Sequence, residues 1–384
     1  MLVRTLLTGM VRTDAAALVG AAVVEFADLA EEPVGVGLRT QLARAQFMTE
    51  RRPEAIVTAD AVLPIAERLD LIAEIADLLV TKGSALNAVG RPREGSGMVE
   101  TGRQLAEADG QDLTVLRATF NGMAPSWEDD PRAVMSRAVR GHELAVRLGR
   151  QDFDVKFREG VAYMALRTGD WEAAETLAND GLDLVPERDR PVLDGALGNF
   201  AVLRGADPDP IVERIDAETA DNLDPDILLH PWWVRMLAGL ATGRRDEVDA
   251  ALCWMASRLP EALRDSLPHL VSSRLHLWAG EERAAAADLT RMRAIPWRGR
   301  MLDANAAALG AGITALQGRP DEALNAYRGA LRLLKDVGAR FDAALVAIDM
   351  ATLLDPAHQE VRAAASDARE LLGRLGAQPF LDRL

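Results

Sequence analysis

The stretch LQGRPDEALNAY, Leu316 to Tyr327, contains the end of one helix, a glycine, a proline with two acids, and the start of another helix. A glycine after a helix can adopt the left-handed conformation that closes the last turn. A proline is tolerated in the first turn of the following helix, because an amide proton there has no partner within the helix. Asp321 and Glu322 fall where the positive end of the helix dipole favours acids. The stretch therefore predicts a junction between the two helices of a hairpin.

Similar junctions recur along the chain at regular intervals. A helical run ends at a glycine before a polar, acid-containing restart in six places: Gly90, Gly169, Gly205, Gly243, Gly280 and Gly318. The successive spacings are 79, 36, 38, 37 and 38 residues, and the first equals two periods of about 39. Counting along the chain in steps of this period locates three more junctions that lack the glycine. One has Glu50 at the glycine position, and the others lie near Glu128 and Pro356. The period is typical of stacked helical hairpins and indicates about nine of them.

Small residues recur in the first helix of most hairpins. Twelve residues before the anchor that opens each second helix, six hairpins carry a small or hydroxyl side chain: Ala43, Gly83, Ala162, Gly198, Ser273 and Ala311. The same count gives Asn121, Met236 and Asp349 in the other three hairpins, so the rule is a tendency. We expect the two helices of a hairpin to approach closely at these positions.

Composition agrees with a helical repeat. The chain has 384 residues, of which 49% are hydrophobic and only 4% aromatic, and good helix formers dominate over β-branched residues. Two amphipathic helices cannot both be buried within one hairpin, so neighbouring hairpins must stack. We expect an all-α, right-handed superhelical solenoid with a period of about 38, forming one domain over 1–384. Its ends are a truncated first hairpin at 1–36 and a C-terminal capping helix and tail at 357–384.

Charge and cysteine content restrict the partners and the compartment. The formal net charge is -15, so phosphate backbones and anionic lipid surfaces should repel the chain, and we expect neither nucleic acid nor membrane as a partner. The longest apolar runs are shorter than the roughly 20 residues that cross a bilayer. The single cysteine, Cys253, fits a reducing cytosol, and its apolar helix beside Trp254 predicts a core position. The expected localisation is cytoplasmic.

No stretch contains a complete set of residues for chemistry. His269 and His276 lie two helical turns apart without further zinc ligands nearby, and the acid-rich segment from Gly205 to Trp233 lacks the central glycine of a calcium loop. The glycine-rich segment GRPREGSGMVETG, Gly90 to Gly102, lacks the lysine of a phosphate-binding loop. We therefore expect no catalytic residue, no cofactor and no metal site.

Two alternatives to a binding protein remain open. A helical toroid also repeats helix pairs, and a glycosidase-like pair of carboxylates among the 59 acids would make the chain an enzyme. Against this, the seven tryptophans are spread about one to a hairpin instead of clustering as a sugar site requires. The second alternative is a repeat domain that binds a small effector.

The repeat resembles the tetratricopeptide class, because of the small residue in the first helix, the glycine at the turn and the Glu322-Ala323 pair that opens the second helix. The long period and the tail ARELLGRLGAQPFLDRL, Ala368 to Leu384, resemble the C-terminal repeat regions of actinobacterial AAA or STAND-type signalling ATPases. Those proteins include nucleotide-cyclase-linked and LuxR-type regulators. The resemblance implies a C-terminal part of a longer regulator, with an ATPase or cyclase domain in the same polypeptide or encoded nearby.

The resemblance also implies where a partner would bind. In tetratricopeptide-like solenoids the first helix of each pair lines a concave groove that receives a protein or peptide. Binding energy at such interfaces concentrates in tryptophan, tyrosine and arginine. The expected function is a non-catalytic interaction scaffold or sensor in bacterial signal transduction. The residues that phase places toward the groove and that we select for partner binding are Arg44, Lys156, Glu159, Tyr163, Asn199, Trp233 and Arg274.

Overall fold

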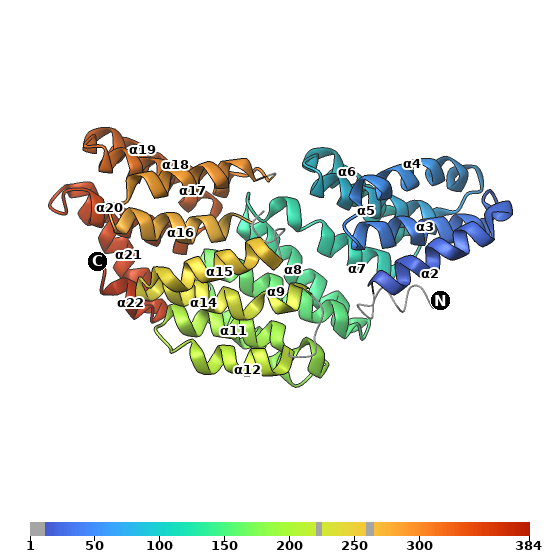
Figure 1. Ribbon diagram of the computed structural model, residues 1–384, viewed down its shortest axis with the longest axis horizontal. Coiled ribbons are helices and arrows are strands. Elements are labelled where there is room, and N and C mark those ends of the chain that lie inside the picture. Colours follow the sequence, from blue (N-terminus) through green and yellow to red (C-terminus); the bar gives the residue numbers. More distant parts are fainter. Residues whose placement is uncertain (1–11, 220–224, 259–264, 296) are drawn as a thin grey trace. The chain divides into compact units, whose positions relative to one another are not determined.

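The computed structural model describes residues 12–219, 225–258, 265–295 and 297–384, and every regular element in these ranges is a helix (Figure 1). The chain divides into two compact units. Unit 1 comprises Met1–Pro125 and Arg140–Phe153, and unit 2 comprises Ser126–Val139 and Asp154–Leu384. The single domain predicted over 1–384 stays a prediction, and the hairpin predicted at 1–36 lies partly outside the described residues.

The helices follow one another as packed pairs. Unit 1 contains α2 (Arg12–Glu25), η1 (Ala27–Leu29), α3 (Pro33–Met48), α4 (Arg52–Arg68), α5 (Ile72–Ala88), α6 (Pro92–Ala108) and α7 (Asp112–Asn121). The short helix η2 (Ala124–Ser126) ends at the first residue of unit 2. The next helix, α8 (Pro131–Arg147), is divided between the two units. Within unit 1, α3 packs on α4 and α5 on α6, as the predicted hairpins require.

Unit 2 continues the same pattern. Its pairs are α9 (Gln151–Thr168) with α10 (Trp171–Leu182), α11 (Arg190–Leu203) with α12 (Asp209–Thr219), α14 (His230–Thr242) with α15 (Arg245–Arg258), α16 (Ser266–Trp278) with α17 (Glu282–Ala294), α18 (Arg300–Leu316) with α19 (Pro320–Val337), and α20 (Arg340–Leu353) with α21 (Gln359–Leu375). The short helices are η3 (Glu187–Asp189), α13 (Pro225–Leu228) and α22 (Gln378–Leu381). The all-α repeat solenoid predicted from the sequence is confirmed.

The junction residues adopt the conformation that their chemistry predicts. All six repeat glycines have a positive φ, between 74° at Gly280 and 99° at Gly205. Glu50, which phase alone assigns to the glycine position, has a φ of 64° although a left-handed conformation is unfavourable for a residue with a side chain. A second series of left-handed residues ends second helices and was not predicted: Asp70, Gly110, Gly149, Gly338 and Gly376.

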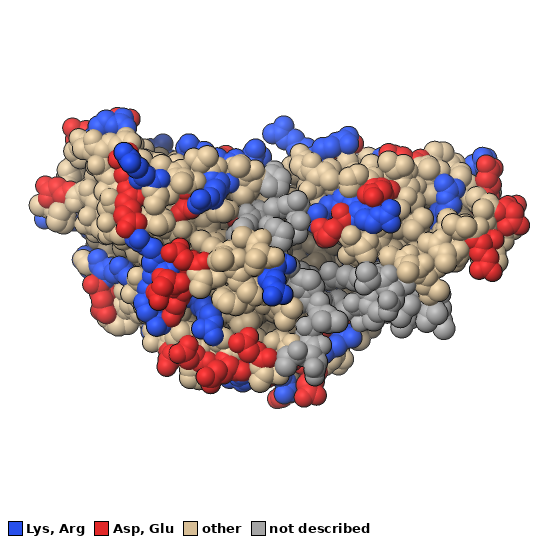
Figure 2. Space-filling model, in the orientation of Figure 1, with Lys and Arg blue, Asp and Glu red and all other residues tan. Residues whose placement is uncertain are grey.

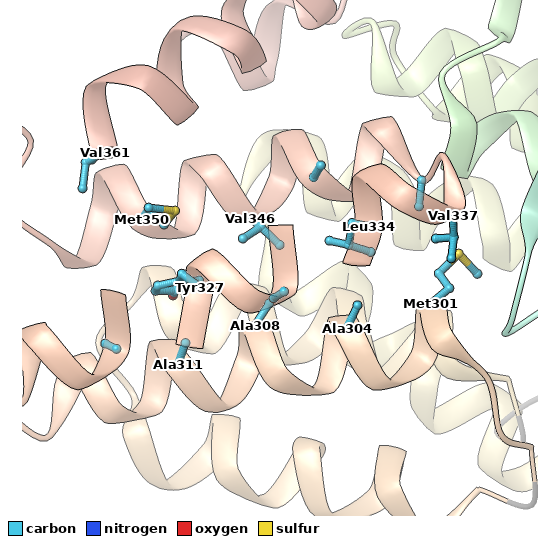
Figure 3. Close-up of a cluster of buried hydrophobic side chains, with 14 residues drawn as sticks. Met301, Ala304, Ala308, Ala311, Tyr327, Leu334, Val337, Val346, Met350 and Val361 are labelled. Carbon is cyan, nitrogen blue, oxygen red and sulfur yellow. The ribbon is translucent and has the colours of Figure 1, made fainter. Parts of the chain in front are cut away.

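The small residues bring paired helices together. A Cβ atom added to Gly83 of α5 would lie 2.6 Å from the carbonyl oxygen of Gly95 of α6, so the two backbones are in contact there. At the next level, side chains of neighbouring hairpins interdigitate around buried Tyr327, which packs with Ala308 and Ala311 of α18 and Met350 of α20 (Figure 3). Helix α19 therefore buries its apolar stripe against α18 of its own hairpin and against the following hairpin.

One predicted core position is wrong. Cys253 of α15 is exposed in the structure. The buried stripe of this helix consists of Val248, Ala251 and Met255, which recur at helical spacing. Cys253 lies off that stripe, so an apolar neighbourhood in the sequence did not indicate the buried face.

Unit 2 closes on itself. At its first hairpin, Arg167 of α9 donates to Asp342 of α20 over 2.8 Å, and the ring centroids of Trp171 and Phe341 are 5.1 Å apart. The C-terminal helices complete this contact, because buried Phe380 of α22 packs edge-on against Phe341. Hairpins at the two ends of unit 2 therefore touch.

The C-terminal segment also covers three of the repeat junctions. A Cβ atom added to Gly169 would lie 3.4 Å from Leu371, and one added to Gly205 would lie 3.2 Å from Pro379. At the third junction, the Arg383 side chain approaches Gly243 and its guanidinium lies over the Trp278 ring. The predicted capping helix and tail thus correspond to α21 and α22, which pack across the ends of earlier hairpins.

Candidate functional site

The residues selected for a groove have different environments. Arg44 belongs to unit 1 and the other six to unit 2. In unit 2, Lys156, Glu159 and Tyr163 are partly exposed on α9. The buried members of the set are Arg44, Asn199, Trp233 and Arg274. Arg274 and Arg44 are buried because their first helices pack on other first helices: α16 on α18 and α20, and α3 on α5.

Arg274 illustrates this burial. Its guanidinium donates to Asp349 of α20 and Asn305 of α18, over 3.3 Å in each case. Asp349 is fully buried and also accepts a hydrogen bond from Trp278 Nε1 over 2.8 Å. Burial raises the pKa of Asp349, while Arg274 and the Trp278 bond oppose that rise. In this structure Arg274 holds three first helices together.

Two other selected residues do come together. The ring of Tyr163 lies 5.9 Å from the ring of Trp233 in an edge-on arrangement. One turn earlier on α9, a Glu159 oxygen lies 3.6 Å from Nε2 of buried His230, the first residue of α14. Helix α9 thus runs past the N-terminal end of α14. Asn199, on α11, is buried, and its Oδ1 has no hydrogen-bond partner among the described residues.

The same stretch of α9 also faces α16. The Tyr163 hydroxyl donates to Oδ2 of Asp265 over 2.6 Å, and Asp265 Oδ1 caps α16 by accepting from the Leu267 amide over 2.9 Å. Burial and the neighbouring Asp265 charge raise the pKa of Tyr163 well above its ordinary value, so the hydroxyl keeps its proton and remains a donor. The hydroxyl of Tyr163, a residue selected for partner binding, is therefore held in place by Asp265, the residue that caps α16.

The sequence analysis predicted only a degenerate junction near Glu128 and missed the role of the WEDD segment (Trp127–Asp130) as a helix cap. The segment caps two helices that follow much later in the chain. The Glu128 carboxylate accepts from the amide of Ser266 over 3.1 Å and from its hydroxyl over 2.9 Å. The Glu128 carbonyl accepts from the Leu302 amide over 2.9 Å, and Asp129 accepts from the Arg300 amide over 2.8 Å.

These contacts satisfy groups that a helix leaves unpaired. The first amides of a helix have no partner within it, and its positive dipole end favours acids. The WEDD segment supplies acceptors to the starts of both α16 and α18. Gly299, the residue before α18, permits the close approach, because an added Cβ atom would lie 2.5 Å from the Asp129 nitrogen. Three acids next to a tryptophan at a junction without glycine were the available sequence signal.

Glu128 has an unusual charge environment. Its side chain is buried, and this desolvation, followed by the nearby Asp265 charge, raises its pKa from 4.5 to about 7. Arg167 and the two Ser266 bonds oppose the rise. Arg167 is itself buried and paired with Asp342, and its Nη2 has no hydrogen-bond partner among the described residues. A carboxyl group of this kind can gain or lose a proton near neutral pH.

Aromatic rings connect the WEDD segment to α9. The centroids of Trp127 and Tyr163 are 5.4 Å apart, so Tyr163 contacts Trp127 as well as Trp233. We call this set, with the charged residues beside it, the α9 face: Lys156, Glu159, Tyr163, Trp127 and Trp233. It combines partly exposed charges with aromatic contacts, which can support binding of another molecule.

No protein-family model matches the chain, and a search of curated proteins finds no significant match. Within the described ranges, no cluster of histidine, cysteine and acidic side chains is arranged to hold a metal ion. No helix among the described residues is both long and apolar enough to span a membrane.

Proposed function

We propose that the protein is a non-catalytic interaction scaffold or sensor that binds a protein or peptide partner. The observation that carries the proposal is the α9 face. Lys156, Glu159 and Tyr163 recur at helical spacing and are partly exposed on one first helix of a repeat solenoid. Tyr163 contacts the rings of both Trp127 and Trp233. A rigid, partly exposed tyrosine beside charges is typical of energetically important interface residues.

The surface charge suits a protein partner better than a uniformly charged ligand. Figure 2 shows basic and acidic side chains intermixed on the viewed face. Mixed charges favour selectivity between protein partners through local complementarity. The regulatory context belongs to the same proposal: a bacterial signalling or transcription regulator, with an ATPase or cyclase domain in cis or encoded nearby. The expected localisation of this regulator is the cytoplasm.

The test compares the wild-type protein with two charge reversals of the same residue type. Lys156→Glu changes the α9 face, whereas Lys335→Glu changes an exposed residue of α19 that pairs with Asp367. Partners captured from native cytosol are purified, and their dissociation constants are measured by calorimetry. We expect Lys156→Glu to weaken binding at least tenfold, equivalent to about 1.4 kcal/mol, and Lys335→Glu to leave it unchanged.

Equal binding by both variants would reject the α9 face, and failure to find any direct partner would reject the scaffold. One observation favours an enzyme as a second candidate. Buried Glu128, with a pKa of about 7 beside Asp265, has the protonation behaviour of a general acid. Hydrolysis of a glycoside panel by the purified protein, abolished in Glu128→Gln, would favour this candidate over the scaffold.

A further inference from the structure

We propose that the WEDD segment is a proton-controlled latch, which holds the starts of α16 and α18 while Glu128 is protonated and is released as Glu128 ionises. The latch acts between parts of the chain that are far apart in sequence. Glu128 and Ser266 are 138 residues apart, and Asp129 and Arg300 are 171 residues apart. The segment therefore adds distant acceptors at the starts of two helices: at Ser266 of α16, beside the local cap Asp265, and at Arg300 and Leu302 of α18.

The charges around Glu128 explain why its proton matters. From α16 it faces Ser266 and the Asp265 carboxylate, and from α9 it faces Arg167 and the Tyr163 hydroxyl. Arg167 is already paired with Asp342 of α20. The fully ionised cluster thus contains three carboxylates, those of Glu128, Asp265 and Asp342, for the one Arg167 guanidinium that acts on Glu128.

Another cation next to the segment, Arg300, is engaged by the two aspartates of the segment and not by Glu128. Arg300 of α18 pairs with Asp129 over 3.0 Å and with Asp130 over 3.1 Å. The pKa of Asp129 is lowered because its bonds to Arg300 outweigh its desolvation. Asp129 therefore stays ionised at neutral pH and contributes a constant hold on α18. The contacts of Glu128 with Ser266 provide the contribution to closure that varies with pH.

The direction in which pH shifts the latch between its closed and open forms follows from proton linkage. In the closed latch the pKa of Glu128 is about 7, against 4.5 for an exposed glutamate. The closed form binds the proton more tightly, so closure is favoured at low pH and weakens as pH rises from 4.5 to 7. Between about pH 6 and about pH 8 the ratio of closed to open forms should fall about tenfold.

Opening would also change the α9 face, because Trp127 belongs to the latch and contacts Tyr163. A rise in pH would remove one aromatic neighbour of that tyrosine. This consequence rests on the proposed function, but the latch itself can be tested without a partner.

The experiment is hydrogen exchange measured by mass spectrometry on the full chain. The reporting amides are those of Ser266, Arg300 and Leu302, which donate to the WEDD segment. After correction for the intrinsic pH dependence, their protection should fall about tenfold from about pH 6 to about pH 8. Peptides from α5 and α6 of unit 1 serve as an internal reference and should show no such change.

Two variants separate the titrating acid from the constant one. Glu128→Gln keeps an acceptor for Ser266 but cannot ionise, so its protection should not change over this pH range. Asp129→Asn should lower protection equally at both pH values and keep the wild-type ratio. The latch is rejected if wild-type protection is the same at both pH values, or if Glu128→Gln retains the wild-type pH dependence.

A third variant keeps the test decisive if Glu128→Gln does not fold. Asp265→Asn removes the Asp265 charge, which together with desolvation raises the pKa of Glu128. Its single side-chain oxygen can still accept from the Leu267 amide, and its amide nitrogen can donate to the Tyr163 hydroxyl. The midpoint of the protection change should move to lower pH. An unchanged midpoint would show that a group other than Glu128 controls the exchange.

Discussion

Replacing Arg274 with methionine should destabilise unit 2 strongly. The substitution keeps much of the apolar stem but leaves Asp349, which is fully buried, without its cationic partner. Removing one member of a buried ion pair typically costs about 3–5 kcal/mol, and methionine also leaves Asn305 Oδ1 without this donor. We therefore expect a loss of about 4 kcal/mol near pH 8.

The loss should depend on pH in a defined direction. Arg274 opposes the rise in the pKa of Asp349, so its removal raises that pKa further. A raised carboxyl pKa makes the folded state hold a proton that the unfolded state releases, so stability falls as pH increases above the unfolded value of 3.8. Arg274→Met should accordingly be less destabilising at about pH 5 than at about pH 8.

Urea unfolding followed by far-ultraviolet circular dichroism measures both effects. The double variant Arg274→Met/Asp349→Asn removes both charges but keeps an acceptor for Trp278, and should recover most of the loss. The control, Arg328→Met, breaks the exposed pair with Glu360 and should change the free energy of unfolding little, because solvent screens exposed ion pairs. A cost for Arg274→Met as small as that of the control, or no recovery in the double variant, would refute the structural role assigned to Arg274.

Three further predictions concern stability. The raised pKa of Glu128 should lower the wild-type free energy of unfolding by about 3 kcal/mol as pH rises from 4.5 to above 7. Urea titrations of Glu128→Gln should show no such contribution. If the wild type and the variant lose stability equally with pH, the prediction is wrong. Gly83→Ala should destabilise unit 1 by about 1–3 kcal/mol because its Cβ meets backbone. Gly97→Ala, in open space on the same hairpin, should stabilise unit 1 by about 0.5–1 kcal/mol, with both variants measured by urea unfolding. Equal effects of the two substitutions would reject the close approach of α5 and α6 at Gly83. Glu50→Gly should raise the midpoint of thermal unfolding, since relief of about 1–2 kcal/mol of left-handed strain exceeds glycine's entropic cost of about 0.5–1 kcal/mol; a lowered midpoint would count against that balance.

The repeat could be predicted because its signals are local. Glycine, proline and acids at a helix junction act through the conformation of a few neighbouring residues, and this is why Glu50 could be assigned from phase alone. The close approach at Gly83 follows from the same register, because a small residue has a physical role only where paired helices meet.

The site could be predicted only in part. Tyr163 and Trp233 were selected and do touch, but the burial of Arg274 depends on how tightly successive first helices pack. That packing is set by contacts among several hairpins and has no local signature. The capping role of Glu128 depends on a helix start 138 residues later, which no spacing rule connects to it.

The contact between Arg167 and Asp342 has a consequence for how unit 2 loses its structure. Ordinary repeat arrays contain interactions between neighbours only, so their terminal repeats can fray independently. Here residues 175 positions apart are joined, and the C-terminal helices rest on three earlier junctions. During synthesis the first hairpins of unit 2 cannot make these contacts until α20, α21 and α22 have been made. Unit 2 should therefore fold slowly for a helical protein and melt as a single cooperative block.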